Sequence, residues 1–139
     1  MRRVVITGMG MVTSLGIGVD RNWDGLLAGK SGIRAIENFD VSDLPAKIAG
    51  QVPEGPTEDG LFFSDDWVSP KDRRRMDDFI VYGLCAAKQA IEDSGWVVET
   101  EEQAWRTGVL IGSGIGGLPE IAGGAIKVNE GKARRLSPF

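Results

Sequence analysis

Residues 4–16, VVITGMGMVTSLG, run from a β-branched apolar stretch straight into a glycine-rich segment. Residues 108–117, GVLIGSGIGG, repeat this arrangement. A continuous apolar run of this kind is typical of a strand in a sheet that is covered on both faces. We therefore expect buried strands at Arg3–Met9 and Arg106–Ile111, each followed by a glycine turn. With helical patterns between them, these strands predict an α/β fold with parallel crossover connections.

The chain between the two glycine-rich stretches has clear helix signals and weaker strand signals. Caps and apolar periodicity predict helices over Arg21–Ala28, Lys71–Arg75, Met76–Ser94 and Leu118–Lys132, with Asp20 and Ser69 as N-caps of the first two. The pair Thr100 and Gln103 has capping-box spacing for a further helix of one turn. Residues 33–36 and 47–52 are candidates for short strands, and residues 53–66 resemble a loop.

Composition excludes several classes of function. The 139 residues carry 16 basic and 20 acidic side chains, a formal net charge of −4, so we expect no nucleic-acid or membrane partner. Cys85 is the only cysteine and there is no histidine, so most acid–base and thiol chemistry is incomplete within this chain. With no signal-peptide pattern and no possible internal disulfide, we expect a cytoplasmic protein. We also expect it to bind no metal and no cofactor of its own.

The glycine-rich stretches allow two interpretations when each is taken alone. GSGIGG between a strand and a helix could cradle a pyrophosphate, because glycines let the backbone approach and the helix start offers free N–H groups. GMGMVTSLG misses the GxGxxG spacing, however, and neither stretch is followed about 20 residues later by an acidic residue that ends a second strand, which counts against a dinucleotide site. The second interpretation is that the glycines only permit tight turns and close packing.

Taken together, the motifs resemble the N-terminal third of β-ketoacyl-acyl carrier protein synthases, most of all the type II elongating enzymes of bacterial fatty acid synthesis. The resemblance rests on five segments in this order: VVITGMGMVTSLG, LLAGKSGI, RRRMDDFIVYGLCAAKQAIEDSG, GVLIGSGIGG and RRLSPF. It implies a thiolase-like fold of αβαβα layers. Residues 1–139 would form most of its first half, within the N-terminal domain of a homodimeric enzyme.

The resemblance also implies a reaction, a decarboxylative Claisen condensation of an acyl-enzyme with malonyl-acyl carrier protein. In that family a cysteine of lowered pKa at a helix N-terminus takes the acyl chain, and two histidines assist decarboxylation. These three catalytic residues belong to sequence beyond Phe139, so this chain is expected to hold none and to be inactive alone. Cys85 lies within a predicted apolar helix, which favours a packed structural thiol.

Two sets of residues match functional positions of the family. Lys71, Arg74 and Arg75 correspond to positions that dock acyl carrier protein, whose phosphopantetheine arm carries the substrate; a solvated helix face is the alternative. Ile115 corresponds to a residue that lines the acyl pocket and limits its depth, with simple core packing as the alternative. Phe139 is a further acyl-pocket candidate.

Two other functions remain open from the sequence. One is a ketosynthase-like partner subunit without the catalytic cysteine, and the other is a nucleotide-binding module. The 139-residue piece by itself is expected to self-associate, because the Arg106–Ile111 strand would lack sheet neighbours and expose an apolar face. Light scattering on the isolated piece checks this expectation, and a monodisperse monomer would contradict it.

Overall fold

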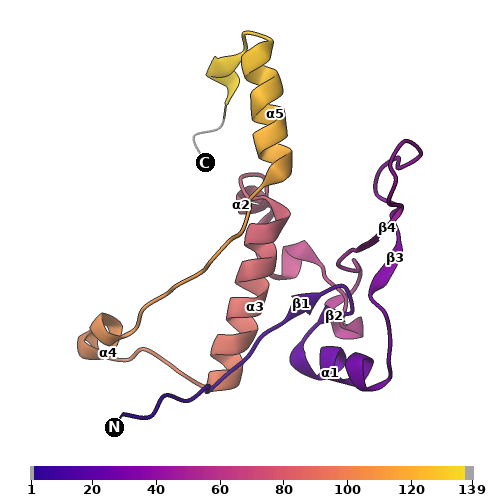
Figure 1. Ribbon diagram of the computed structural model, residues 1–139. Helices are drawn as coiled ribbons and strands as arrows, with labels where there is room; N and C mark the ends of the chain where they lie inside the picture. The colour runs from indigo at the N-terminus through magenta and orange to yellow at the C-terminus, as the bar shows by residue number, and fades with distance from the viewer. Residues whose placement is uncertain (1, 137–139) are drawn as a thin grey trace.

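A computed structural model describes residues 2–136 and is built around one long helix (Figure 1). This helix, α3 (Asp78–Ser94), is crossed near its C-terminal end by the N-terminal segment, and α5 (Leu118–Asn129) extends beyond its N-terminal end. The other helices are α1 (Val19–Leu27), α2 (Pro70–Arg73) and α4 (Glu101–Arg106). Short 3-10 turns η1, η2 and η3 occupy Thr57–Asp59, Ser64–Asp66 and Ala133–Arg135.

The strands form two small antiparallel sheets. In the first, β1 (Val12–Thr13) pairs with β2 (Gly16–Ile17), with Val12 opposite Ile17. Gly16, directly after the two-residue turn at residues 14–15, has φ 126°, a conformation that favours glycine. In the second sheet, β3 (Ile33–Ala35) pairs with β4 (Ile48–Gly50), which confirms both weaker strand predictions.

The prediction of buried strands at Arg3–Met9 and Arg106–Ile111 is wrong for this structure. Neither segment is paired, and Val4 and Leu110 are 96% and 100% exposed. A strand is stabilised by hydrogen bonds to a neighbour, and residues 2–136 supply no neighbour to either segment. The predicted parallel sheet is therefore absent from the described residues, whose one parallel pairing is the isolated bridge between Glu54 and Phe62.

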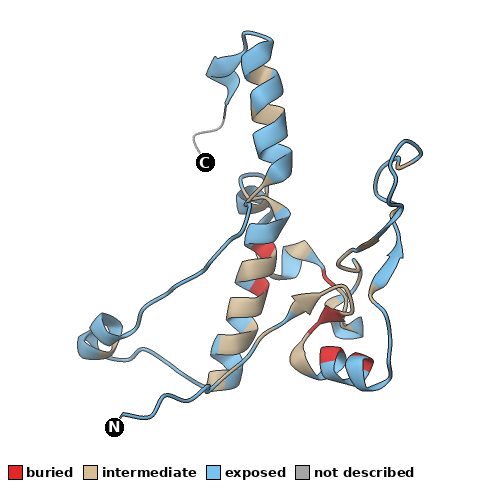
Figure 2. Ribbon diagram, viewed as in Figure 1, coloured by how far each residue is buried: buried red, intermediate tan, exposed pale blue. Residues whose placement is uncertain are grey.

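A small core lies where α3 meets the first sheet and the loop over residues 53–68 (Figure 2). Val81 and Cys85 on α3 are fully buried, and they cluster with Ile17 and Phe62. The ring of Phe62 packs edge-on against Tyr82, with centroids 4.8 Å apart. This core fixes α3 relative to the hairpin and the loop.

The helix ends follow the local capping signals closely. Thr100 and Gln103 form the predicted capping box of α4, and Gly95 ends α3 in the left-handed conformation. The assignment of Asp20 as an N-cap is wrong, since Gly18 occupies that position and Asp20 lies in the first turn of α1. Buried Asn22 explains the earlier start, because its amide donates to the carbonyls of Gly16 and Gly18 and its oxygen accepts from Thr13.

The first glycine-rich stretch packs against α3. A Cβ on Gly8 would overlap the carbonyl oxygen of Ala90, and a Cβ on Gly10 would overlap that of Ala86. Gln89 holds the same segment by accepting from the Met11 amide at 3.2 Å and donating to the Met11 carbonyl at 3.3 Å. Gly8 and Gly10 therefore serve close packing, as the second interpretation proposed, and neither has a positive φ.

Many large apolar side chains are exposed to solvent. Val5, Ile6, Val109 and Ile111 all exceed 60% exposure, which agrees with the apolar surface expected beside an unpaired strand. Over the described residues, no helix combines the length and apolar character needed to cross a bilayer.

Candidate functional site

The predicted docking cations lie on and just after α2, whose start is set by Ser69. The Ser69 hydroxyl accepts from the Asp72 amide at 3.2 Å and donates to the Asp72 carboxylate at 2.8 Å. Pro70 occupies the first helical turn, where its missing N–H costs nothing. This local capping confirms the predicted helix start, although α2 ends at Arg73 rather than Arg75.

The four cations of this region divide into two groups. Arg73 is half-buried, donates to the Met76 carbonyl at 2.7 Å and forms an ion pair with Asp78. Its guanidinium is thus used to join α2 to the first turn of α3. Lys71, Arg74 and Arg75 are exposed. These three exposed residues are the ones that the family resemblance assigns to docking.

Ile115 lies on the exposed turn of residues 112–117, which we call the Ile115 turn. Its side chain is 72% exposed, so the alternative of simple core packing does not hold for residues 2–136. Gly116 has φ 81° and approaches Phe79, whose Cζ lies 3.9 Å from a Cβ built on this glycine. The structure therefore brings the turn against the start of α3 while leaving Ile115 open. Phe139 lies outside the described residues.

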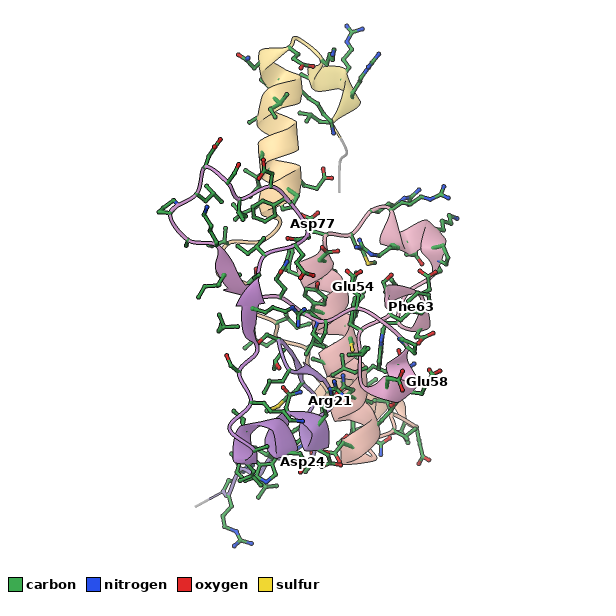
Figure 3. All side chains as sticks on the ribbon, turned by 90° about the vertical axis from the view of Figure 1, so that its right-hand side faces the viewer. Arg21, Asp24, Glu54, Glu58, Phe63 and Asp77 are labelled. Carbon is green, nitrogen blue, oxygen red and sulfur yellow. The ribbon has the colours of Figure 1, made fainter. Side chains whose placement is uncertain are left out.

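Both predicted sites are connected to the N-terminal end of α3, which Asp77 marks in Figure 3. Arg73 ties α2 to Asp78, and the adjacent Asp77 packs against Gly117 at the start of α5. The docking cations and the Ile115 turn, about 40 residues apart in sequence, are thus joined to one end of one helix. The local sequence around Asp77 does not reveal this contact, because its partner Gly117 is 40 residues away.

Cys85 is fully buried, as predicted for a structural thiol. Burial raises the pKa of its thiol, and the hydrogen bond from Gln89 and the charge of Lys88 offset this only in part. A raised pKa lowers the fraction of reactive thiolate at neutral pH. Its chemistry is therefore that of a packed apolar side chain.

We expect Cys85 to resist alkylation in the folded protein. Treating the complete protein with iodoacetamide at pH 8 should leave the peptide containing Cys85 unmodified, whereas the same treatment in denaturant should modify it fully. Mass spectrometry of the digested protein measures both. Rapid modification of the folded protein would contradict a buried thiol of raised pKa.

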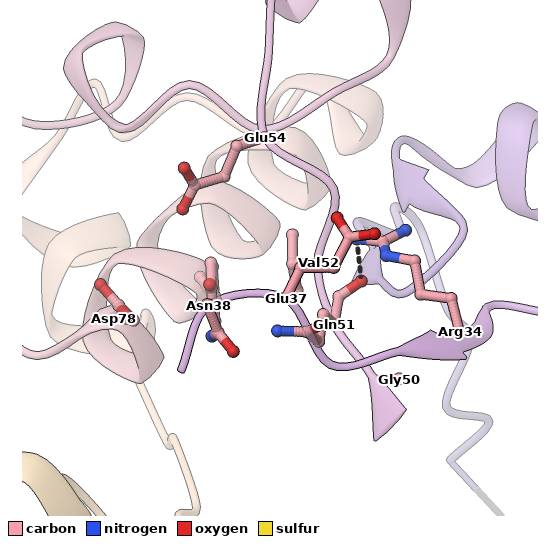
Figure 4. Close-up of a pocket in the computed structure, with 9 residues that line it drawn as sticks. Arg34, Glu37, Asn38, Gly50, Gln51, Val52, Glu54 and Asp78 are labelled. Carbon is pink, nitrogen blue, oxygen red and sulfur yellow. Dashed lines mark hydrogen bonds between the residues drawn. The ribbon is translucent and has the colours of Figure 1, made fainter. Parts of the chain in front are cut away.

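A polar cavity of about 510 Å³ lies between the β3–β4 hairpin and the start of α3 (Figure 4). Arg34, Glu54 and Asp78 contribute charges to its lining, and Arg34 donates to the Gln51 carbonyl. Burial raises the pKa of Tyr82 in the same lining, and the negative charges of Asp78 and Glu54 raise it further. The cavity includes none of the predicted acyl or docking residues, and its charged walls do not suit an acyl chain.

Comparisons with known proteins match the whole chain to one family. All 139 residues match the family described as "Beta-ketoacyl synthase, N-terminal domain". The chain is 50% identical over 139 residues to "3-oxoacyl-[acyl-carrier-protein] synthase 2" of Rhizobium meliloti (strain 1021), covering 100% of this chain and 33% of the relative. It is 46% identical over 138 residues to the Vibrio harveyi protein of the same name, covering 99% and 31%.

A solved structure agrees with these relatives. "The ishigamide ketosynthase/chain length factor" has a TM-score of 0.70 and 30% sequence identity, and the match covers 99% of this chain and 32% of that chain. The chain spans about a third of the length of all three proteins. The predicted fold class is confirmed at the level of the family, although the two apolar segments lack strand partners within residues 2–136. The chain belongs to the β-ketoacyl synthase family, as part of its N-terminal domain, and has the α/β, thiolase-like fold of that family.

Proposed function

We propose that this chain is the N-terminal segment of a 3-oxoacyl-[acyl carrier protein] synthase that elongates fatty acids. The observation that carries the proposal is the 50% identity to such a synthase over the full 139 residues. In the complete protein the acyl chain moves from its carrier to a cysteine and is attacked by the carbanion formed from malonyl-carrier protein with loss of CO₂. The product is longer by two carbons.

Within this function the chain contributes recognition. It has no histidine and its one thiol is buried, so the nucleophile and both histidines of the proposed mechanism come from the rest of the protein. Lys71, Arg74 and Arg75 would attract the acidic acyl carrier protein and its phosphopantetheine arm. Ile115, together with Phe139, would line the acyl pocket. The complete enzyme would be a cytoplasmic homodimer that binds no further cofactor.

The exposed apolar segments support the proposal that residues 1–139 are one part of a larger domain. Val4, Val109 and Leu110 are more than 85% exposed although their neighbours favour a buried strand. The remaining two thirds of a protein the size of its relatives would supply the missing sheet neighbours.

A partner subunit that lacks catalysis is the second candidate. It is favoured by one observation, the similarity to a solved ketosynthase/chain length factor at 30% identity. The relatives that are 46–50% identical are all synthases by name, which favours the enzyme. Membership of this family over all 139 residues leaves no support for the nucleotide-binding alternative.

Turnover by the complete protein tests the proposal. Purified protein supplied with carrier protein loaded with an acyl chain, and with carrier protein loaded with malonyl, should release CO₂ and form a 3-oxoacyl product in equal amounts. The control is the same protein with its expected nucleophilic cysteine replaced by alanine. Absence of product from protein that is folded and binds acyl-carrier protein would favour the partner subunit instead.

The size of the side chain at position 115 should determine which acyl chains are accepted. Ile115→Phe adds bulk to the proposed pocket, so kcat/KM should fall about tenfold or more for long acyl chains and change little for short ones. The matched control is Ile121→Phe, which makes the same change at an exposed position of α5. Equal loss for long and short chains in the Ile115 variant would contradict the pocket role.

A further inference from the structure

The Ile115 turn is anchored at one place. Every residue from Ala104 to Ala122 is exposed except Gly116 and Gly117, which are partly buried. These two glycines follow Ile115 directly and contact Phe79 and Asp77 of the α3 start. The position of the turn therefore depends on this contact, because nothing else in residues 104–122 is even partly buried.

Asp77 fills the space that a side chain on Gly117 would take. A Cβ on Gly117 would overlap Oδ2 of Asp77 and lie 3.1 Å from its Cβ. The backbone of Asp77 is itself fixed, because its carbonyl accepts from the Ile80 amide at 3.0 Å in the first turn of α3. The contact thus requires glycine on one side and a short, rigidly placed side chain on the other.

The Asp77 carboxylate is not used to cap its own helix. Asp77 is the N-cap residue of α3 but its side chain accepts no capping hydrogen bond there, and α5 has no side-chain cap either. The carboxylate instead lies between the N-terminal ends of both helices (Figure 3), where helix dipoles favour a negative charge. Its neighbour Asp78 is engaged by Arg73, which leaves Asp77 to interact with the start of α5.

We propose that Asp77 is a positioning residue that holds the Ile115 turn against α3 and so maintains discrimination between acyl chains of different length. The proposal rests on the proposed function, in which Ile115 lines the acyl pocket. Ile115 is two residues from Gly117, so freedom gained at Gly117 passes directly to its backbone. In a looser turn the Ile115 side chain can move away from a bound acyl chain. The kcat/KM values for long and short acyl chains then become more similar.

The proposal is tested on the complete enzyme by comparing its kcat/KM for a long and a short acyl-carrier substrate. For Asp77→Ala, the ratio of kcat/KM between a long and a short acyl-carrier substrate should move toward one by about fivefold. Asp77→Asn keeps the shape and should stay within about twofold of the wild-type ratio. Glu120→Gln is the matched control, because it removes a carboxylate from the first turn of α5 without touching Gly117. An unchanged ratio in Asp77→Ala, or an equal change in Glu120→Gln, overturns the proposal.

A double-mutant cycle locates the effect in the contact. In the wild-type background, Gly117→Ala should move the kcat/KM ratio between long and short substrates toward one. When Asp77 is already alanine, the same change should have a smaller additional effect, since the overlapping carboxylate is gone. Strictly additive effects overturn the proposal. If Asp77→Ala does not fold, Asp77→Ser takes its place in both measurements.

Amide hydrogen exchange separates this proposal from the proposed function. Residues 113–118 should exchange faster in Asp77→Ala than in Glu120→Gln, whether or not the protein condenses acyl chains. A wild-type protein without condensation activity would contradict the proposed function. Equal exchange rates of residues 113–118 in the two variants would contradict only the anchoring role of Asp77.

Discussion

Changing Arg74 and Arg75 to glutamate raises the KM of the complete enzyme for acyl-carrier protein by about tenfold or more and leaves kcat unchanged. Both side chains are exposed at the end of α2, where they would attract the acidic carrier before the acyl chain reaches the pocket. Charges of this kind act on encounter, so the chemical step is spared. Steady-state kinetics over a range of carrier concentrations measure the change.

Salt and a matched variant distinguish docking from a general charge effect. Raising the ionic strength should weaken carrier binding to the wild type and have little effect on the reversed variant, because the attraction is already gone. Lys30→Glu with Lys47→Glu makes the same change in net charge at exposed positions outside α2. An equal rise in KM for that control, or no rise for Arg74 and Arg75, would place the docking surface elsewhere.

Helix boundaries could be predicted where the signal is local. Ser69, the Thr100–Gln103 pair and Gly95 each act on atoms within four residues of themselves, so the sequence alone specifies their caps. The strands at Arg3–Met9 and Arg106–Ile111 could not be predicted in the same way. A strand exists only through its neighbour, and the neighbour is not encoded in the strand.

The candidate site also combines features that could be predicted from the sequence with contacts that could not. The family resemblance predicted Lys71, Arg74 and Arg75 as docking residues, and the structure adds that Arg73 is committed to Asp78. No local signal could have revealed that Asp77 serves Gly117, because an aspartate before a helix ordinarily caps that helix. Sequence indicates the residue types at such a site, whereas the pairing over 40 positions emerges only when α3 and α5 are folded.

Replacing Gly10 with valine should destabilise the complete protein by about 3 kcal/mol or more, the largest stability effect that we expect. The Cβ would overlap the carbonyl oxygen of Ala86 and lie 2.8 Å from the Cβ of Gln89, so the segment has to move off α3. That movement also breaks the two hydrogen bonds between Gln89 and Met11. Urea denaturation followed by circular dichroism measures the loss.

The choice of control follows from what a side chain would meet at each glycine. Gly83 lies in the middle of α3, and a Cβ there has no described atom within 4 Å outside its own helix. Gly83→Ala should therefore stabilise the protein by about 0.5–1 kcal/mol through helix propensity. If Gly10→Val and Gly83→Ala had similar effects, close packing against α3 would not be the reason for the first glycine-rich stretch. The opposite signs expected here instead assign Gly10 to contact with α3.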